Sequence, residues 1–178
     1  MGLFGKKKLS EIQSAGQFVL MVTKNVQHNW PEIAKDLNSI LMLHAENTIS
    51  DDHLAGFEFA LAVIATQLQA LPNLLPSDQA NRIRDHVMQC ISSPDLGSYP
   101  REVIQEYQNA WDQSIQEGEP PFYGIASVLF DKLECRSVVK LGGSSFNDPL
   151  LLDALSEKVV TFGGPWWKTV TQKYKLVS

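Results

Sequence analysis

The chain has 178 residues, of which 44% are hydrophobic and 20% charged, and these are the values of one ordinary globular domain. Its formal net charge of −5 argues against a nucleic-acid partner, because nucleic-acid-binding domains are usually basic. The two cysteines, Cys90 and Cys135, are too few for a disulfide scaffold. We expect both to be buried free thiols in a reducing compartment.

The N-terminal sequence contains three consecutive lysines, Lys6, Lys7 and Lys8, but no apolar run as long as a signal peptide requires. No stretch of the chain is expected to reach the ~20 apolar residues of a membrane-spanning helix. We therefore expect a cytoplasmic protein. Residues 1–8 are predicted to form a flexible basic tail, and residues 9–178 a single helical domain.

Apolar residues recur every three or four positions along most of the chain, which predicts an all-α fold without a β-hairpin. The first helix should run from about residue 9 to residue 27. Ser10 and Gln13 have the spacing of a capping box at its start. The buried face of this helix is predicted to consist of Leu9, Ile12, Val19, Leu20 and Val26.

Two further helices are expected before the first proline-rich break. The second should run from residue 29 to residue 47, because Asn29 and Glu32 repeat the capping-box spacing and Pro31 suits a first helical turn. The third, about residues 52–71, is apolar on nearly all sides. A helix of this kind is usually surrounded by others, so we predict that it forms the centre of the fold.

The rest of the chain is predicted to form shorter helices separated by glycine and proline. Their apolar stripes lie at about residues 78–91, 103–115, 125–133, 149–162 and 166–174. The fold is therefore expected to be a compact bundle of seven or eight helices around the central helix. The only extended chain expected is a short stretch at Val138 and Val139.

Glu58 is a candidate for a chemical role because it lies among apolar residues on the central helix. A carboxyl group in such a position must be paired, protonated or exposed. If it is buried, Glu58 could act as an acid or base in an interhelical pocket, with His44 and His53 as its candidate partners. If it reaches water or bonds a neighbouring backbone group, its role is structural, and we favour this second alternative.

The C-terminal segment combines aromatic and basic residues: Trp166, Trp167, Lys168 and Tyr174. Adjacent helical residues point about 100° apart, so one indole can be buried while the other is exposed as a binding anchor. Two alternatives remain for this segment. Both rings could fix the last helix to the core, or the segment could move about residues 163–164 and bind an acidic protein or an anionic membrane surface.

The sequence contains no helical metal-ligand spacing, no nucleophile elbow and no phosphate-binding loop, so we expect neither a metal nor a cofactor. We therefore favour a non-enzymatic interaction or regulatory module that binds a protein partner through Trp166, Trp167, Lys168 and Tyr174. One alternative is a small-molecule-binding protein or enzyme with a pocket near Glu58. The other is a peripheral membrane protein held by its basic termini.

Overall fold

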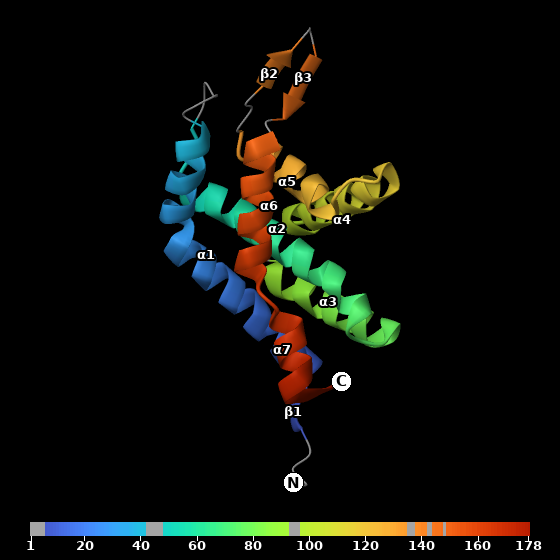
Figure 1. The fold of residues 1–178 in the computed structure, drawn as a ribbon. Helices are drawn as coiled ribbons and strands as arrows, with labels where there is room; N and C mark the ends of the chain where they lie inside the picture. The colour runs from blue at the N-terminus through green and yellow to red at the C-terminus, as the bar shows by residue number, and fades with distance from the viewer. Residues whose placement is uncertain (1–5, 42–47, 93–96, 135–137, 142–143, 148) are drawn as a thin grey trace.

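Helices with apolar residues at three- and four-residue spacing account for most of the chain (Figure 1), which confirms the all-α prediction. The computed structural model describes residues 6–41, 48–92, 97–134, 138–141, 144–147 and 149–178. In chain order the helices are α1 (Glu11–Leu41), α2 (His53–Ala70), the 3₁₀ helix η1 (Leu71–Asn73), α3 (Ser77–Ile91), α4 (Tyr99–Glu117), α5 (Pro121–Lys132), α6 (Pro149–Gly163) and α7 (Trp166–Lys173). The short strands are β1 (Lys7–Ser10), β2 (Val138–Leu141), β3 (Ser144–Asn147) and β4 (Tyr174–Val177).

Helix α1 joins two helices that the sequence separates, so the predicted boundary near residue 28 was wrong. The predicted cap at its start is present, since the backbone N–H of Gln13 donates to Ser10 Oγ over 3.2 Å. Pro31 lies inside the helix, where it removes one backbone hydrogen bond, and the helix bends near its middle (Figure 1). The helix continues past Pro31 because its neighbours Trp30 and Ile33 are buried in the core.

The predicted buried face of α1 was partly wrong. Ile12 and Leu20 are 55% and 53% exposed. The buried stripe instead consists of Ala15, Phe18, Val19, Val22 and Val26. This set follows the helical repeat from Ala15 onward, whereas Ile12 lies at the edge of the stripe and Leu20 well outside it. Cys90 on α3 is also exposed rather than buried, and Cys135 lies outside the described residues.

Helix α2 is the enclosed centre of the structure, as its all-round apolar sequence predicted. Every residue from Phe59 to Leu68 is buried, and α1, α4, α5 and α6 pack around the helix (Figure 1). Its first turn is capped by Asp52, whose Oδ1 accepts the backbone N–H of Ala55 over 2.9 Å. The segment His53–Asn73 is in fact long and apolar enough to cross a membrane, contrary to our expectation, but it is 67% buried by the surrounding fold.

A β-hairpin does form, and the prediction that the chain contains none was wrong. Strands β2 and β3 pair antiparallel, with Val138 opposite Asn147 and Leu141 opposite Ser144. The extended chain expected at Val138 and Val139 is the first half of this hairpin. A hairpin is recognised by alternating apolar and polar residues along its strands. Each strand here has only four residues, and so short a stretch does not show this alternation.

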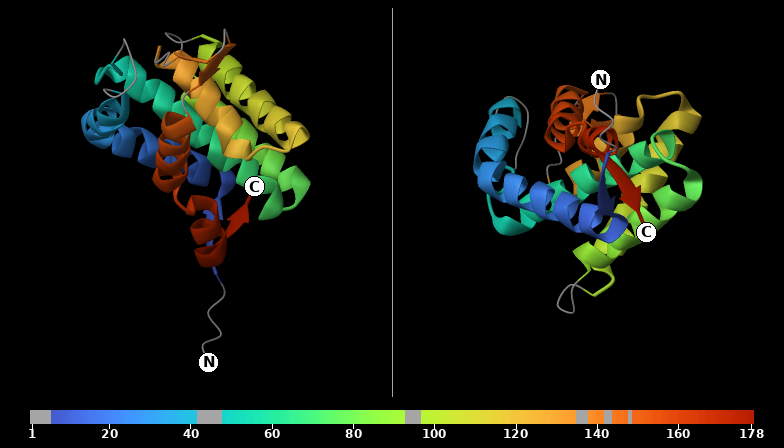
Figure 2. Two further views of the ribbon diagram at one scale, coloured as in Figure 1. Left: turned by 45° about the horizontal axis from the view of Figure 1, so that its top comes forward. Right: turned by 90° about the horizontal axis from the view of Figure 1, so that it is seen from below.

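The two ends of the described chain meet in a second small sheet. Strands β1 and β4 run parallel and side by side beyond α7, as Figure 2 shows. Leu9 pairs with Leu176, and both side chains pack against the core, which holds the sheet to the helices. Lys7 and Lys8, which the sequence assigned to a flexible tail, therefore lie in β1.

Candidate functional site

The two tryptophans of α7 pack on the same side chain, Phe18 of α1. The ring centroid of Phe18 lies 6.2 Å from that of Trp166 and 5.0 Å from that of Trp167. Trp167 is only 1% exposed, whereas Trp166 is partly exposed. The adjacent indoles therefore divide as the sequence suggested, into one buried ring and one partly accessible ring. Trp167 fixes α7 to α1, and its ring is not accessible to a partner in this conformation.

The turn that precedes α7 is well packed on one side. Gly163 is buried, and a Cβ atom there would lie 2.6 Å from Nε2 of Gln67 on α2. Gly164 adopts a φ of +51°, which an L side chain rarely takes. At residues 163–164 the chain therefore changes direction between α6 and α7 in a conformation that favours glycine. Removing the chain from residue 163 onward would also remove the buried Trp167.

Parallel pairing of β1 and β4 joins the basic residues of the two chain ends. The register sets Lys7 beside Tyr174 and Lys8 beside Lys175. Residues paired across strands project on the same face, so Lys8 and Lys175 place two like charges next to each other. Lys6 continues this side, and its Nζ donates to the carbonyl oxygen of Thr171 over 2.6 Å.

We call this region the basic pole. It consists of Lys6, Lys7, Lys8, Lys168, Lys173 and Lys175, all exposed. Within the described part of the chain, none of these lysines forms an ion pair with a carboxylate. They are six of the 15 lysine and arginine residues in an acidic protein. Positive charge is therefore concentrated at one end of the molecule, while the remainder is strongly acidic.

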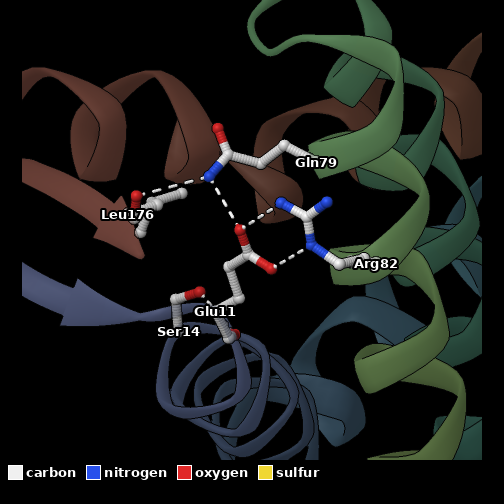
Figure 3. Close-up of polar contacts among 5 residues, drawn as sticks. All are labelled: Glu11, Ser14, Gln79, Arg82 and Leu176. Carbon is white, nitrogen blue, oxygen red and sulfur yellow. Dashed lines mark hydrogen bonds and ion pairs between the residues drawn. The ribbon is translucent and has the colours of Figure 1, made fainter. Parts of the chain in front are cut away.

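Next to the basic pole, the buried carboxylate of Glu11 forms a network of hydrogen bonds, as Figure 3 shows. Glu11, the first residue of α1, is only 1% exposed and accepts two hydrogen bonds from Arg82 of α3, over 2.9 and 3.0 Å. Gln79 donates to Glu11 over 2.8 Å and also, over 3.4 Å, to the carbonyl oxygen of Leu176 in β4. The hydroxyl of Ser14 donates to the backbone carbonyl of Glu11. This network ties α1, α3 and β4 together.

Electrostatics favours the charged form of Glu11. The hydrogen bond from Arg82 lowers the pKa of the carboxyl below its ordinary value, and Gln79 acts in the same direction, although burial opposes both. The sequence does not distinguish Glu11 from other acidic residues in a first helical turn. Such residues are stabilised by the helix dipole and usually need no further partner. Its true partners lie about 70 residues away along the chain, and local spacing does not reveal such pairs.

Glu58 is half-buried between α2, α4 and α5. It accepts a short hydrogen bond from the hydroxyl of Tyr99, while its other oxygen, Oε2, is buried without a partner among the described residues. Burial raises the pKa of the carboxyl above its ordinary value and Glu106 adds to this, whereas Tyr99 and Lys132 oppose it. The hydroxyl of Tyr107 is likewise buried without a described partner, and burial and Glu58 raise its pKa.

The histidines proposed as partners of Glu58 are not part of this arrangement. His53 is exposed at the start of α2 and lines a small cleft of about 30 Å³ together with Gly56 and Gln27, but not Glu58. His44 lies outside the described residues. The groups near Glu58 are instead the two tyrosines and an ion pair, in which Lys132 Nζ lies 2.8 Å from Glu106 Oε2.

The described part of the chain contains no group of three or more histidine, cysteine, aspartate or glutamate residues placed to hold a metal ion. Comparisons with known protein families, with curated proteins and with solved structures found no match. A function for this chain must therefore be argued from the geometry of its own surface. The basic pole is the feature of that surface with the most marked charge.

Proposed function

We propose that this chain is a non-enzymatic interaction module that binds an acidic segment of a partner protein at the basic pole. The observation that carries the proposal is the pairing of β1 with β4, which sets Lys8 beside Lys175. Like charges on neighbouring strands destabilise a sheet, so an arrangement that retains them favours an anionic ligand that offsets the repulsion.

An extended acidic peptide fits this surface better than a compact anion does. Strand β1 packs on β4 and on the start of α1, and its other edge pairs with no described strand. An unpaired strand edge can accept a further strand through backbone hydrogen bonds. The exposed lysines Lys7 and Lys8 would flank such a strand and attract carboxylates along it.

The predicted partner-binding residues divide between two roles under this proposal. Lys168 belongs to the pole, the partly buried Tyr174 borders it, and both would contact the partner. Trp166 adds a partly accessible ring beside them. Trp167 would contribute indirectly, because it holds α7 and thus the start of β4 in place.

The test is binding of a labelled glutamate-rich peptide, measured by fluorescence anisotropy at increasing salt. We expect K8Q/K175Q to weaken binding at least tenfold at low salt, and we expect the binding to native protein to fall as salt screens the charges. The matched control is K24Q/K35Q, which removes two exposed lysines of α1 and should change the affinity little. Equal affinity of the two double variants would refute the proposal.

Vesicles containing phosphatidylserine form the second arm of this experiment. The membrane alternative requires that such vesicles bind the protein while the acidic peptide does not, and that K8Q/K175Q abolishes vesicle binding. Tight peptide binding without vesicle binding supports the protein-partner proposal. Point variants are used because removal of residues 163–178 would also remove the buried Trp167.

A second candidate function is a small-molecule site or enzyme near Glu58. It is supported by two buried polar atoms without described partners, Glu58 Oε2 and the Tyr107 hydroxyl, on facing helices. Catalysis often uses a carboxyl group whose pKa burial has raised. A ligand whose binding is lost in E58Q would favour this candidate, and an unchanged affinity would refute it.

A further inference from the structure

A cavity of about 460 Å³ opens between the C-terminal end of α2, the facing sides of α4 and α5, and the turn from α6 to α7. Its apolar walls come from Trp111, Phe122, Val160 and Pro165. The rings of Trp111 and Phe122 meet edge to face, with centroids 4.9 Å apart and planes at 87°. This packing fixes both rings to each other, so the aromatic wall exists before any ligand enters.

Gln67 gives the cavity a polar floor. The residue is only 8% exposed, yet its side-chain amide forms no hydrogen bond with any residue in the described ranges. The enclosed polar atoms without a partner in the described ranges do not include those of Gln67, so its amide is still reached by solvent. Gln67 lines the cavity, so a ligand there can replace that solvent and bond the amide. The absence of a side chain at Gly163 leaves room for the amide, since a Cβ there would lie 2.6 Å from Gln67 Nε2.

The remaining polar groups of the lining are uncharged. Besides Gln67 they are Thr66, Gln69, Asn73 and Thr161. The hydroxyl of Thr66 already donates to the carbonyl oxygen of Ala62 over 2.9 Å, so it can offer only an acceptor to a ligand. A charged ligand would lose its hydration here without meeting an opposite charge. The lining therefore selects neutral molecules.

We propose that this cavity binds a small, neutral, planar molecule that carries a hydrogen-bond donor and an acceptor side by side. The amide of Gln67 pairs with both atoms, because it too presents a donor and an acceptor on neighbouring positions. The ring of the ligand lies against Trp111 and Phe122. This site is distinct from the basic pole and does not depend on the function proposed above.

The test uses three planar probes of the same shape and different charge: benzamide, benzoate and protonated benzamidine. Saturation-transfer NMR of the intact protein should detect benzamide and neither charged probe. Q67L keeps the size of the side chain and removes its amide, so it should weaken benzamide binding at least fivefold. The matched control is Q116L, an exposed position of α4 outside the cavity, which should leave the affinity unchanged.

A second variant covers the case in which Q67L fails to fold. Val160 is 40% exposed at the rim of the cavity, so V160W should fill the entrance without disturbing the core and should abolish benzamide binding. Binding of benzoate or benzamidine as well as benzamide would overturn the proposal. So would unchanged benzamide affinity in folded Q67L or in V160W. Binding of a phenylalanine-containing peptide in place of benzamide would also overturn it and would identify the cavity as a docking site for a partner's side chain.

Discussion

The ion pair between Glu11 and Arg82 provides a direct test of how the two chain ends are held. In E11Q the side chain keeps its shape and its contact with Gln79, but the charge that attracts Arg82 is lost. Breaking a fully buried pair costs about 3–5 kcal/mol. Arg82 is 48% exposed and regains water when its partner is lost, so we expect a smaller decrease of about 2 kcal/mol in the free energy of unfolding.

The pH dependence of this loss follows from the lowered pKa of Glu11. A carboxyl whose pKa is lower in the folded state stabilises the protein above its unfolded pKa, which is near 4.5, and this contribution disappears as the pH falls through the folded value. The native protein and E11Q should therefore differ at pH 7, and the difference should shrink as the pH falls below the unfolded pKa and through the lowered folded pKa.

Urea denaturation of the native protein, E11Q and E32Q at pH 7 and at lower pH measures this effect. Glu32 is an exposed residue of the same helix with no described partner, so E32Q controls for the loss of one negative charge. Equal stabilities of E11Q and E32Q at pH 7 would refute the reasoning. A stability difference between the native protein and E11Q that stays constant down to pH 3 would refute it as well.

Four other predictions concern packing and burial, and the same denaturation assay checks each. A Cβ at Gly124 would lie 2.1 Å from the carbonyl oxygen of Ala110, so G124A should destabilise the protein by about 3 kcal/mol or more, and a near-native stability would contradict this close approach of α4 and α5. Gly16 is also helical, but a Cβ there would meet only Cys90 Sγ at an ordinary contact distance of 3.9 Å, so G16A should stabilise the protein by about 0.5–1 kcal/mol, as alanine does in a helix interior. The buried hydroxyl of Tyr107 has no described partner, so Y107F should be neutral or stabilising, whereas a clear loss of stability would show that a water or ligand satisfies the hydroxyl. Because the folded pKa of Glu58 is raised, ionised Glu58 destabilises the fold at neutral pH. E58Q should therefore be more stable than the native protein at pH 7, and this gain should shrink as the pH falls through the folded pKa.

The fold class and the central helix could be predicted because both depend on local periodicity. An apolar sequence on every side of α2 requires a surrounding without water, and in this fold the other helices supply it. The boundary within α1 was misplaced because Asn29, Pro31 and Glu32 match the sequence pattern of a helix N-terminus. This local pattern carries no information about the tertiary burial of Trp30. Tertiary packing outweighed the local preference at this point.

The candidate site was predicted in its parts but not in its assembly. The basic clusters at the two ends are visible in the sequence, as are the adjacent tryptophans. Their meeting depends on a parallel pairing between strands of four residues, which carry no usable alternation. The cavity lined by Gln67 could not be predicted for a similar reason. Gln67 lies in the most apolar helix, and the room for its amide depends on Gly163, which is far away in the sequence.

The β1–β4 sheet also determines when, during synthesis, the two lysine clusters can come together. Lys6, just before β1, donates to the carbonyl oxygen of Thr171 in α7, and the two residues are 165 positions apart in the chain. At ribosomal speeds of roughly 5–20 residues per second, β1 waits many seconds for the strand that completes it. A nascent chain thus carries the lysines of β1 before β4 is available to pair with them. Any partner that requires the paired arrangement would ignore incomplete chains, so binding itself reports that synthesis has passed β4.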